Sequence, residues 1–377
     1  MRPDTFVARL ARVRQAMVGA GVDALLLSLG ADLPWLTGYT AMPLERLTML
    51  VVPAAEGARS EQVPVLFVPE LEAPRVAQVP GAFALAPWGE TDNPVAMVAD
   101  LVRVITGDAP RLAISDRAWA TFLLQLKASL PGARWTVASA VTAPLRAVKD
   151  ESEVAALAAA SAAADRVAAR LLGGEIALVG RTERQVSAEL SRLLLAEGNE
   201  RVNFAIVASG PNAASPHHEA SDRVIAAGEA VVCDFGGALD GYCSDITRTV
   251  FTGDPPAELR HIYEVVAQAQ AAGVDAAEVG VPCHRVDEAA RKVITDAGYG
   301  QYFIHRTGHG IGLEEHEDPY MVSGNGAPIA VGHAFSVEPG IYMAGRWGVR
   351  IEDIVVVTSS GPLNLNQADR GLTVLSV

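Results

Sequence analysis

The stretch VVCDFGGALDGYCSDITRTV, residues 231–250, decides the fold of the second half of this chain. Val231–Cys233 and Ile246–Phe251 read as two strands, and the GG and DG pairs between them are turn residues, so the pattern predicts a β-hairpin. Asp234 and Asp245 lie at its ends, at strand positions that aspartate disfavours. Two facing carboxylates repel each other unless they share a cation. The alternative is a pair of turn-capping aspartates on a solvated hairpin.

Three further side chains of the metal-ligand type follow this hairpin. His309 stands between two glycines, which allow a close backbone approach, and Glu338 and Glu352 flank a strand–turn–strand pattern that resembles the first hairpin. Four carboxylates and one imidazole suit Mn²⁺, Co²⁺, Fe²⁺ or Zn²⁺. Four negative charges converge only if about two dications balance them. Two such ions about 3.5–4 Å apart support hydrolysis.

Composition excludes several classes of function. The chain has 377 residues and a formal net charge of −14, which argues against nucleic acid and anionic membranes as partners. The charged N-terminus does not read as a secretory signal, and no stretch of about 18 apolar residues lacks charge. Three cysteines form no disulfide framework, so we expect a reducing cytoplasm. Cys233 and Cys243 flank the aspartates and are interpreted as packing residues.

The first part of the chain alternates between strand and helix patterns, which predicts an α/β domain over residues 1–143. The expected helices are 4–19, 93–106 and 117–130, and the expected strands are 23–29, 48–52, 63–68, 111–115 and 134–137. A Pro/Gly loop is expected before the second strand. Residues 144–155 are expected to be a linker that runs into an Ala-rich helix.

Residues 156–377 are expected to form a second domain of strands and helices. A capping box, Thr182–Gln185, opens its second helix. The expected strands are 203–208, the hairpin, 334–337, 340–343, 348–357 and 372–376, and the later helices are 254–272 and 282–297. The overall fold class is therefore α+β.

Taken together, these motifs resemble the pita-bread metallopeptidases, in the Xaa-Pro branch that contains prolidase and aminopeptidase P. The resemblance covers most of the chain and implies that residues 156–377 form the pita-bread catalytic domain, with an antiparallel sheet inside and helices outside. Its catalytic motifs are DFGGALDGYCSDITRT (234–249), GHGIGLEEHE (308–317), VEPGIY (337–342) and VRIED (349–353). LPWLTGYT (33–40) and LERLTMLVV (44–52) resemble the creatinase-like N-terminal domain of the family, and LRAVKDESEV (145–154) resembles its interdomain linker.

The resemblance implies a role for each matching ligand in a site with two divalent metal ions. Asp234 would chelate one metal, and His309 and Glu338 would hold the other. Asp245 and Glu352 would bridge both. Glu338 would also manage the proton of the bridging water. Mn²⁺ is the expected metal, although the ligand set also accepts Co²⁺, Zn²⁺ or Fe²⁺.

The resemblance also implies residues that bind substrate. His217 and His316 would steady the substrate carbonyl, His217 being preferred over its neighbour His218. His305 would line the pocket near the proline, or it is a satisfied structural histidine. Arg350 would receive a substrate carboxylate, or it pairs with a neighbouring acid. Trp35 would reach the active site of a partner subunit, or it belongs to the N-terminal core.

The expected function is hydrolysis of Xaa-Pro bonds by a cytoplasmic dinuclear metallopeptidase, a prolidase that releases proline from dipeptides. An Xaa-Pro aminopeptidase of the aminopeptidase P type is the alternative. A creatinase-like hydrolase of a small C–N bond and a catalytically dead binding module remain as less favoured classes. Proline-containing dipeptides or short peptides are the expected partners, with a homodimer as the expected assembly.

Overall fold

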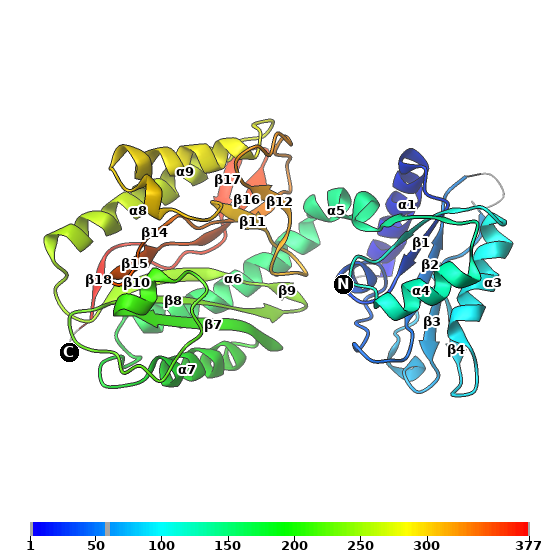
Figure 1. Cartoon of the computed structure of the whole chain (residues 1–377), viewed down its shortest axis with the longest axis horizontal. Helices are drawn as coiled ribbons and strands as arrows, with labels where there is room; N and C mark the ends of the chain where they lie inside the picture. The colour runs from blue at the N-terminus through cyan, green and yellow to red at the C-terminus, as the bar shows by residue number, and fades with distance from the viewer. Residues whose placement is uncertain (1–2, 57–60, 376–377) are drawn as a thin grey trace. The chain divides into compact units, whose positions relative to one another are not determined.

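A computed structural model describes residues 3–56 and 61–375. Two compact units make up the chain and divide between Arg146 and Ala147 (Figure 1). The predicted linker region is almost entirely helical, because one helix runs to Ala147 and the next begins at Glu151. Asp150 and Glu153 form a capping box at the start of that second helix, which fixes where it begins.

The first unit is built on a six-stranded mixed sheet in the order β4-β3-β2-β1-β5-β6. Its strands are β1 (Ala24–Leu27), β2 (Met49–Pro53), β3 (Val65–Pro69), β4 (Ala84–Trp88), β5 (Arg111–Ile114) and β6 (Arg134–Val137). Its helices are α1 (Pro3–Ala20), α2 (Asp32–Thr37), α3 (Pro94–Thr106), α4 (Ala120–Ser129) and α5 (Ser139–Ala147), with a 3-10 turn η2 (Ala73–Arg75). Apolar residues of α3 and α4 pack on the sheet to form its core.

Two elements of this unit differ from the sequence expectation. The predicted Pro/Gly loop contains the short helix α2, whose buried residues include Trp35 and Leu36 and which ends at Gly38 in a left-handed conformation. Strand β4 was not predicted, because it is only partly buried, contains Pro87 and lies at the sheet edge, where alternation is weak.

The second unit contains two larger sheets and one two-stranded ribbon. Its helices are α6 (Glu151–Leu172), α7 (Glu183–Ala196), α8 (Ala257–Asp275) and α9 (His284–Asp296), with 3-10 turns η3 (Gly210–Ala214) and η4 (Gly300–Tyr302). The first sheet is β18-β10-β8-β7 with β9 beside β8: β7 (Arg201–Ser209), β8 (Ala230–Leu239), β9 (Tyr242–Cys243), β10 (Ile246–Phe251) and β18 (Thr373–Val374). The second is β12-β11-β13-β16-β17: β11 (Gly308–Gly310), β12 (Glu317–Met321), β13 (Ala334–Val337), β16 (Asp353–Thr358) and β17 (Gly361–Asn364). The ribbon pairs β14 (Gly340–Met343) with β15 (Trp347–Arg350).

Helices cover the strands of this unit from two sides, with α8 and α9 on one side and α6 and α7 on the other (Figure 1). Apolar residues of α6 and α7 form a core with β7, β8 and β10, and those of α8 and α9 form another with β14 and β15. A buried ion pair of 2.8 Å between Arg248 of β10 and Asp353 of β16 ties the two larger sheets together. Among the helices of the described ranges, none combines the length and apolarity needed to cross a bilayer.

The central hairpin forms, but its turn is shorter than predicted. Strand β8 continues through Gly236 and Gly237, and the reversal is made by Asp240 and Gly241, both with positive φ. A Cβ on Gly236 would lie 2.1 Å from the carbonyl oxygen of Ser244. The glycine pair therefore allows two strands to approach closely and does not form a turn.

The predicted strand 348–357 is interrupted. It ends as β15 at Arg350 and resumes as β16 at Asp353, because Glu352 leaves the ladder and makes an isolated bridge to Thr247 of β10. The predicted last strand is confirmed only as β18, and Ser376 of that prediction lies outside the described residues.

Candidate active site and metal centre

Five segments bring the candidate metal ligands together within the second unit. Asp234 lies in the middle of β8, and Asp245 directly precedes β10. His309 is the central residue of β11, Glu338 follows β13, and Glu352 lies in the break between β15 and β16. Four of the five therefore sit at strand ends, breaks or a three-residue strand, where the backbone leaves regular pairing and can aim a side chain inward.

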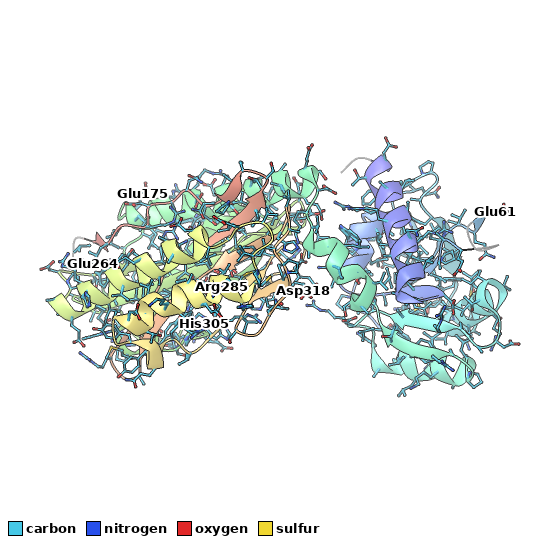
Figure 2. The ribbon with its side chains drawn as sticks, turned by 90° about the horizontal axis from the view of Figure 1, so that it is seen from above. Glu61, Glu175, Glu264, Arg285, His305 and Asp318 are labelled. Atoms are coloured by element: carbon cyan, nitrogen blue, oxygen red, sulfur yellow. The ribbon has the colours of Figure 1, made fainter. Side chains whose placement is uncertain are left out.

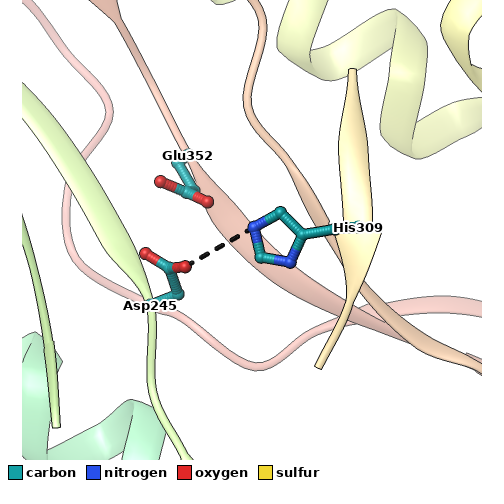
Figure 3. A group of neighbouring side chains, drawn as sticks. All are labelled: Asp245, His309 and Glu352. Carbon is teal, nitrogen blue, oxygen red and sulfur yellow. Dashed lines mark ion pairs between the residues drawn. The ribbon is translucent and has the colours of Figure 1, made fainter. Parts of the chain in front are cut away.

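Three of these side chains form a compact cluster. One ligand atom each from Asp245, His309 and Glu352 lies within 4.8 Å of the others (Figure 3). The Nε2 atom of His309 is 3.7 Å from Oδ2 of Asp245 and 3.4 Å from Oε1 of Glu338. Asp234 reaches the same pocket from β8. The structure thus brings all five predicted ligands to one place.

Positive charge compensates the carboxylates of this cluster only in part, through Arg350, which pairs with Asp234 at 2.6 Å. Burial, and then the charge of Glu352, raise the pKa of Asp245 well above its usual range, and burial with the charge of Glu338 does the same for Glu352. Burial raises the pKa of Glu338 to about 7. In the described part of the chain, the buried Oδ1 atoms of Asp234 and Asp245 have no hydrogen-bond partner. Crowded, desolvated acids with unpartnered oxygens fit divalent cations well.

The tautomer of His309 also suits a metal ligand. Its Nδ1 lies 3.1 Å from the carbonyl oxygen of Gly310, so the proton on Nδ1 is donated there and the Nε2 lone pair faces the carboxylates. Burial, and then the neighbouring His316, lower the pKa of His309 to about 3, so the imidazole is neutral. A Cβ on Gly308 would lie 1.8 Å from the carbonyl oxygen of Ser336, which confirms the close approach predicted at this position.

A pocket of about 560 Å³ opens over this cluster. Its lining includes the five candidate ligands, an apolar wall and a group of basic side chains. The apolar wall consists of Phe204, Ile206 and Val322, and the basic side chains are His217, His305, Arg306, His316 and Arg350. All predicted substrate-binding residues of the second unit therefore reach the pocket.

The two histidines expected to steady the substrate carbonyl differ from the others in exposure. His217 and His316 are both exposed at the pocket, and the ring of His316 lies 3.8 Å from that of His309, centroid to centroid. His218 points elsewhere, because its Nε2 lies 2.8 Å from Oε2 of Glu183. The arrangement favours His217 over His218 as the residue that faces substrate.

Arg350 and His305 are held by protein groups. The Nη2 of Arg350 donates to Oδ2 of Asp234 at 2.6 Å, its Nη1 donates to the Tyr342 hydroxyl at 2.9 Å, and its Nε donates to Oγ1 of Thr247 at 3.1 Å. His305 has its Nε2 2.9 Å from the Tyr342 hydroxyl and its Nδ1 2.7 Å from a backbone carbonyl (His305 is labelled in Figure 2, on the side that α8 and α9 cover). Both residues fit the structural alternatives raised from the sequence.

The burial of Trp35 favours the N-terminal core over contact with substrate. Its side chain has no exposed surface and lies in the core of the first unit. The guanidinium of Arg9, itself buried, lies 5.4 Å from the ring centroid and donates to the Trp35 carbonyl oxygen. A ring enclosed in this way cannot reach an active site without unpacking the core, so the core interpretation is favoured.

Sequence reasoning missed several residues that support the site. Tyr342 was quoted within VEPGIY, and Thr247 within the hairpin motif, but neither was given a role. Thr247 donates from Oγ1 to Oε2 of Glu352 at 2.6 Å. The sequence did offer a signal for both residues, because Thr247 and Tyr342 each lie on a predicted strand close to a candidate ligand. Glu183, inside the capping box, gave no signal, because an acid in the first turn of a helix is ordinarily solvated.

Glu183 is fully buried and organises the loop that carries His217. Its carboxylate accepts seven hydrogen bonds from six donor atoms, which belong to the last residue of β7 and to the loop that follows. The donors are Ser209 N and Oγ, Asn212 Nδ2, His218 Nε2, and Ser221 N and Oγ, at 2.6–3.1 Å. Burial alone would raise the pKa of Glu183, but these donors lower it to about 2.

We expect Glu183→Gln to lower the free energy of unfolding by about 3 kcal/mol at pH 7, since a fall in pKa from 4.5 to about 2 corresponds to roughly 1.4 kcal/mol per unit. The contribution is present above pH 4.5 and is lost as the pH falls towards 2, because the folded-state pKa is depressed. Urea unfolding at several pH values measures it. Exposed Glu175→Gln is the control. A difference that persists unchanged at pH 2.5 would contradict the assignment.

Comparison with known proteins agrees with this architecture. The model of the creatinase/prolidase N-terminal domain matches residues 9–148, and that of metallopeptidase family M24 matches residues 155–359. The fold predicted from the sequence, a creatinase-like domain followed by a pita-bread domain, is confirmed.

Individual relatives match over most or all of the chain. The probable dipeptidase PepE of Mycobacterium tuberculosis is 42% identical over 376 residues, covering 99% of this chain and 98% of the relative. The Xaa-Pro dipeptidase of Lactobacillus delbrueckii is 39% identical over 292 residues, covering 76% and 79%. The crystal structure of dipeptidase PepE from Mycobacterium ulcerans is 43% identical, covers both chains completely and superposes with a TM-score of 0.92. The chain belongs to metallopeptidase family M24.

Proposed function

We propose that this protein hydrolyses Xaa-Pro peptide bonds and that dipeptides are its preferred substrates. The observation that carries the proposal is a group of three buried carboxylates, one partly buried carboxylate and one neutral imidazole that line one pocket together with exposed histidines. Among the described residues, two oxygens of this group have no hydrogen-bond partner. A relative named Xaa-Pro dipeptidase, 39% identical over 76% of this chain, supports the choice of proline. A relative matched over 98% of its length is named only as a probable dipeptidase.

Two divalent cations would be held by the five candidate ligands. Asp234 would chelate one ion, His309 and Glu338 the other, and Asp245 and Glu352 both. When bound, such ions polarise a carbonyl and lower the pKa of water. The cluster supports this assignment because the imidazole of His309 is neutral, and because a bound cation would offset the raised carboxyl pKa values of Asp245 and Glu352. Mn²⁺ is our proposal for the metal, and Co²⁺, Zn²⁺ and Fe²⁺ suit the same donors.

The remaining residues would bind and orient the substrate. His217 and His316, exposed at the pocket, would donate hydrogen bonds to the scissile carbonyl oxygen as negative charge develops on it. Glu338, whose pKa burial raises to about 7, would carry the proton from the attacking water to the leaving nitrogen. Phe204, Ile206 and Val322 offer an apolar surface for the side chain that precedes the proline.

The experiment that tests the proposal compares alanyl-proline with alanyl-prolyl-glycine after loading the protein with Mn²⁺, Co²⁺ or Zn²⁺. We expect cleavage of the dipeptide with a higher kcat/KM than of the tripeptide, and no cleavage of alanyl-alanine at a comparable rate. A preference for the tripeptide would support the aminopeptidase P alternative. Hydrolysis of creatine would support the creatinase-like hydrolase. Protein that binds metal but hydrolyses none of these substrates would support the binding module.

The assembly and compartment are also proposals. The three cysteines are free and buried, which supports a reducing compartment such as the cytoplasm. A homodimer rests on the family resemblance, and light scattering of the purified protein measures it. Because Trp35 is enclosed in the first unit, a partner subunit would have to contact the pocket through other residues.

A further inference from the structure

Two arginines line the pocket, and their surroundings differ. Arg350 is 2% exposed and donates to Asp234, Tyr342 and Thr247. Arg306 lies on the segment between η4 and β11 and is partly exposed. Within the described residues, no carboxylate forms an ion pair with Arg306, although Glu315 and Glu338 line the same pocket. Arg306 therefore has no close anionic partner, and its charge acts on Glu338 from beyond ion-pair distance.

The guanidinium of Arg306 is nevertheless held in place. Its Cζ lies 4.3 Å from the ring centroid of Tyr320, and its Nη2 lies 3.4 Å from Nδ1 of His316. Stacking on an aromatic ring fixes the plane of a guanidinium while leaving its edge donors accessible. The long contact to His316 occupies at most one of five N–H donors. A preorganised fork with free edges is suited to bind a carboxylate in bidentate fashion.

The charge of the pocket explains why a substrate carboxylate would need this residue. Four acids lie at the pocket floor, and Arg350 is already engaged with one of them. An anionic substrate would be repelled by that floor unless its carboxylate binds where positive charge is available. The side chain of Arg306 provides that charge, next to the histidine proposed to contact the scissile carbonyl.

We propose that Arg306 binds the C-terminal carboxylate of the substrate and thereby makes the enzyme select dipeptides. This inference rests on the proposed function. It replaces Arg350 in the role that the sequence suggested for that residue. A free carboxylate one residue after the scissile carbonyl would reach the fork, whereas a peptide that continues past the proline would place a neutral amide there and lose the charged contact.

The test compares the wild type with Arg306→Gln on alanyl-proline and on alanyl-prolinamide, after metal loading. We expect the wild type to prefer the acid. The variant should lose 10- to 100-fold in kcat/KM on the acid, mainly through KM, and less than threefold on the amide. Arg306→Lys should recover part of the loss because it keeps the charge without the fork. Arg285→Gln, an exposed charge change on α9, is the matched control.

A binding measurement separates this inference from the proposed function. Isothermal titration of the metal-loaded protein with proline and with prolinamide requires no turnover. We expect the wild type to bind proline more tightly and Arg306→Gln to lose that preference. Should the wild type cleave neither dipeptide, the proposed function fails, and the titration alone decides the role of Arg306.

Three results would overturn the inference. Equal losses on the acid and the amide would make Arg306 a positioning residue for His316. Full activity of Arg306→Gln on alanyl-proline would leave it without a role in binding. Equal affinity of the wild type for proline and prolinamide, or no measurable binding of proline, would remove the carboxylate site.

Discussion

Asp245→Asn is expected to abolish metal binding and to lower kcat/KM by about 10³-fold or more while the protein stays folded. Asp245 is 4% exposed and clusters with His309 and Glu352, so an amide in its place removes a charge from the shared centre of the ligand set. Metal ions supply several kcal/mol of transition-state stabilisation, and each 1.4 kcal/mol is a factor of ten. Metal analysis and dipeptide hydrolysis measure both losses.

The same variant should make the metal-free protein more stable. The folded-state pKa of Asp245 is raised well above its usual range by burial and by the charge of Glu352, so this acid destabilises the fold progressively as the pH rises above about 4. Replacing it with a neutral amide removes that penalty. In chelator at pH 8 we expect Asp245→Asn to have a higher Tm than the wild type, with the gap shrinking at pH 5.

Metal addition should reverse this order. A ligand at 100 times its Kd stabilises the folded state by about 2.7 kcal/mol, so the wild type gains Tm on loading and the variant gains little. Asp254→Ala changes an exposed acid of the same unit and should behave as the wild type in every assay. A variant that keeps its metal-induced shift in Tm, or that hydrolyses dipeptide without bound metal, would refute the assignment of Asp245.

The cluster of candidate metal ligands could be predicted from the sequence because these residues stand in local patterns that are costly without a bound ligand. An aspartate inside an apolar strand and a histidine between two glycines are unfavourable choices unless something binds there. The strand patterns also predicted the hairpin, and the second strand begins and ends as expected at Ile246 and Phe251. The motifs also occur in the order expected from the resemblance, which predicts that the fold brings them together.

The residues that could not be predicted are those whose role depends on partners distant in sequence. Glu183 reads as an ordinary first-turn acid until its loop folds over it 26 to 38 residues later. Arg350 and Arg306 look equally suited to bind a carboxylate, and only the contact with Asp234, 116 residues away, distinguishes them. The GG pair in the hairpin misled the prediction because close strand packing and turns both favour glycine.

Arg350→Met is expected to lower the free energy of unfolding by about 3–5 kcal/mol, because removing one member of a buried charge pair leaves the other uncompensated. The guanidinium is the donor that satisfies Oδ2 of Asp234, and it also holds the Tyr342 hydroxyl that contacts His305. Loss of the guanidinium would leave the negative charge of Asp234 unpaired in a cluster that already contains three other carboxylates. Urea unfolding of the chelated protein measures the effect.

The effect of substitution on catalysis distinguishes Arg350 from Arg306. If Arg350 orders the metal ligands, Arg350→Lys, which keeps the charge and folds more readily, should reduce kcat/KM equally on alanyl-proline and alanyl-prolinamide, and should weaken metal binding. Arg346→Met on the same β14–β15 ribbon removes a half-exposed guanidinium paired with Glu258 and should cost less than about 1 kcal/mol. A loss confined to the free acid would instead restore Arg350 as the carboxylate receptor, because only direct contact with the substrate distinguishes an acid from its amide.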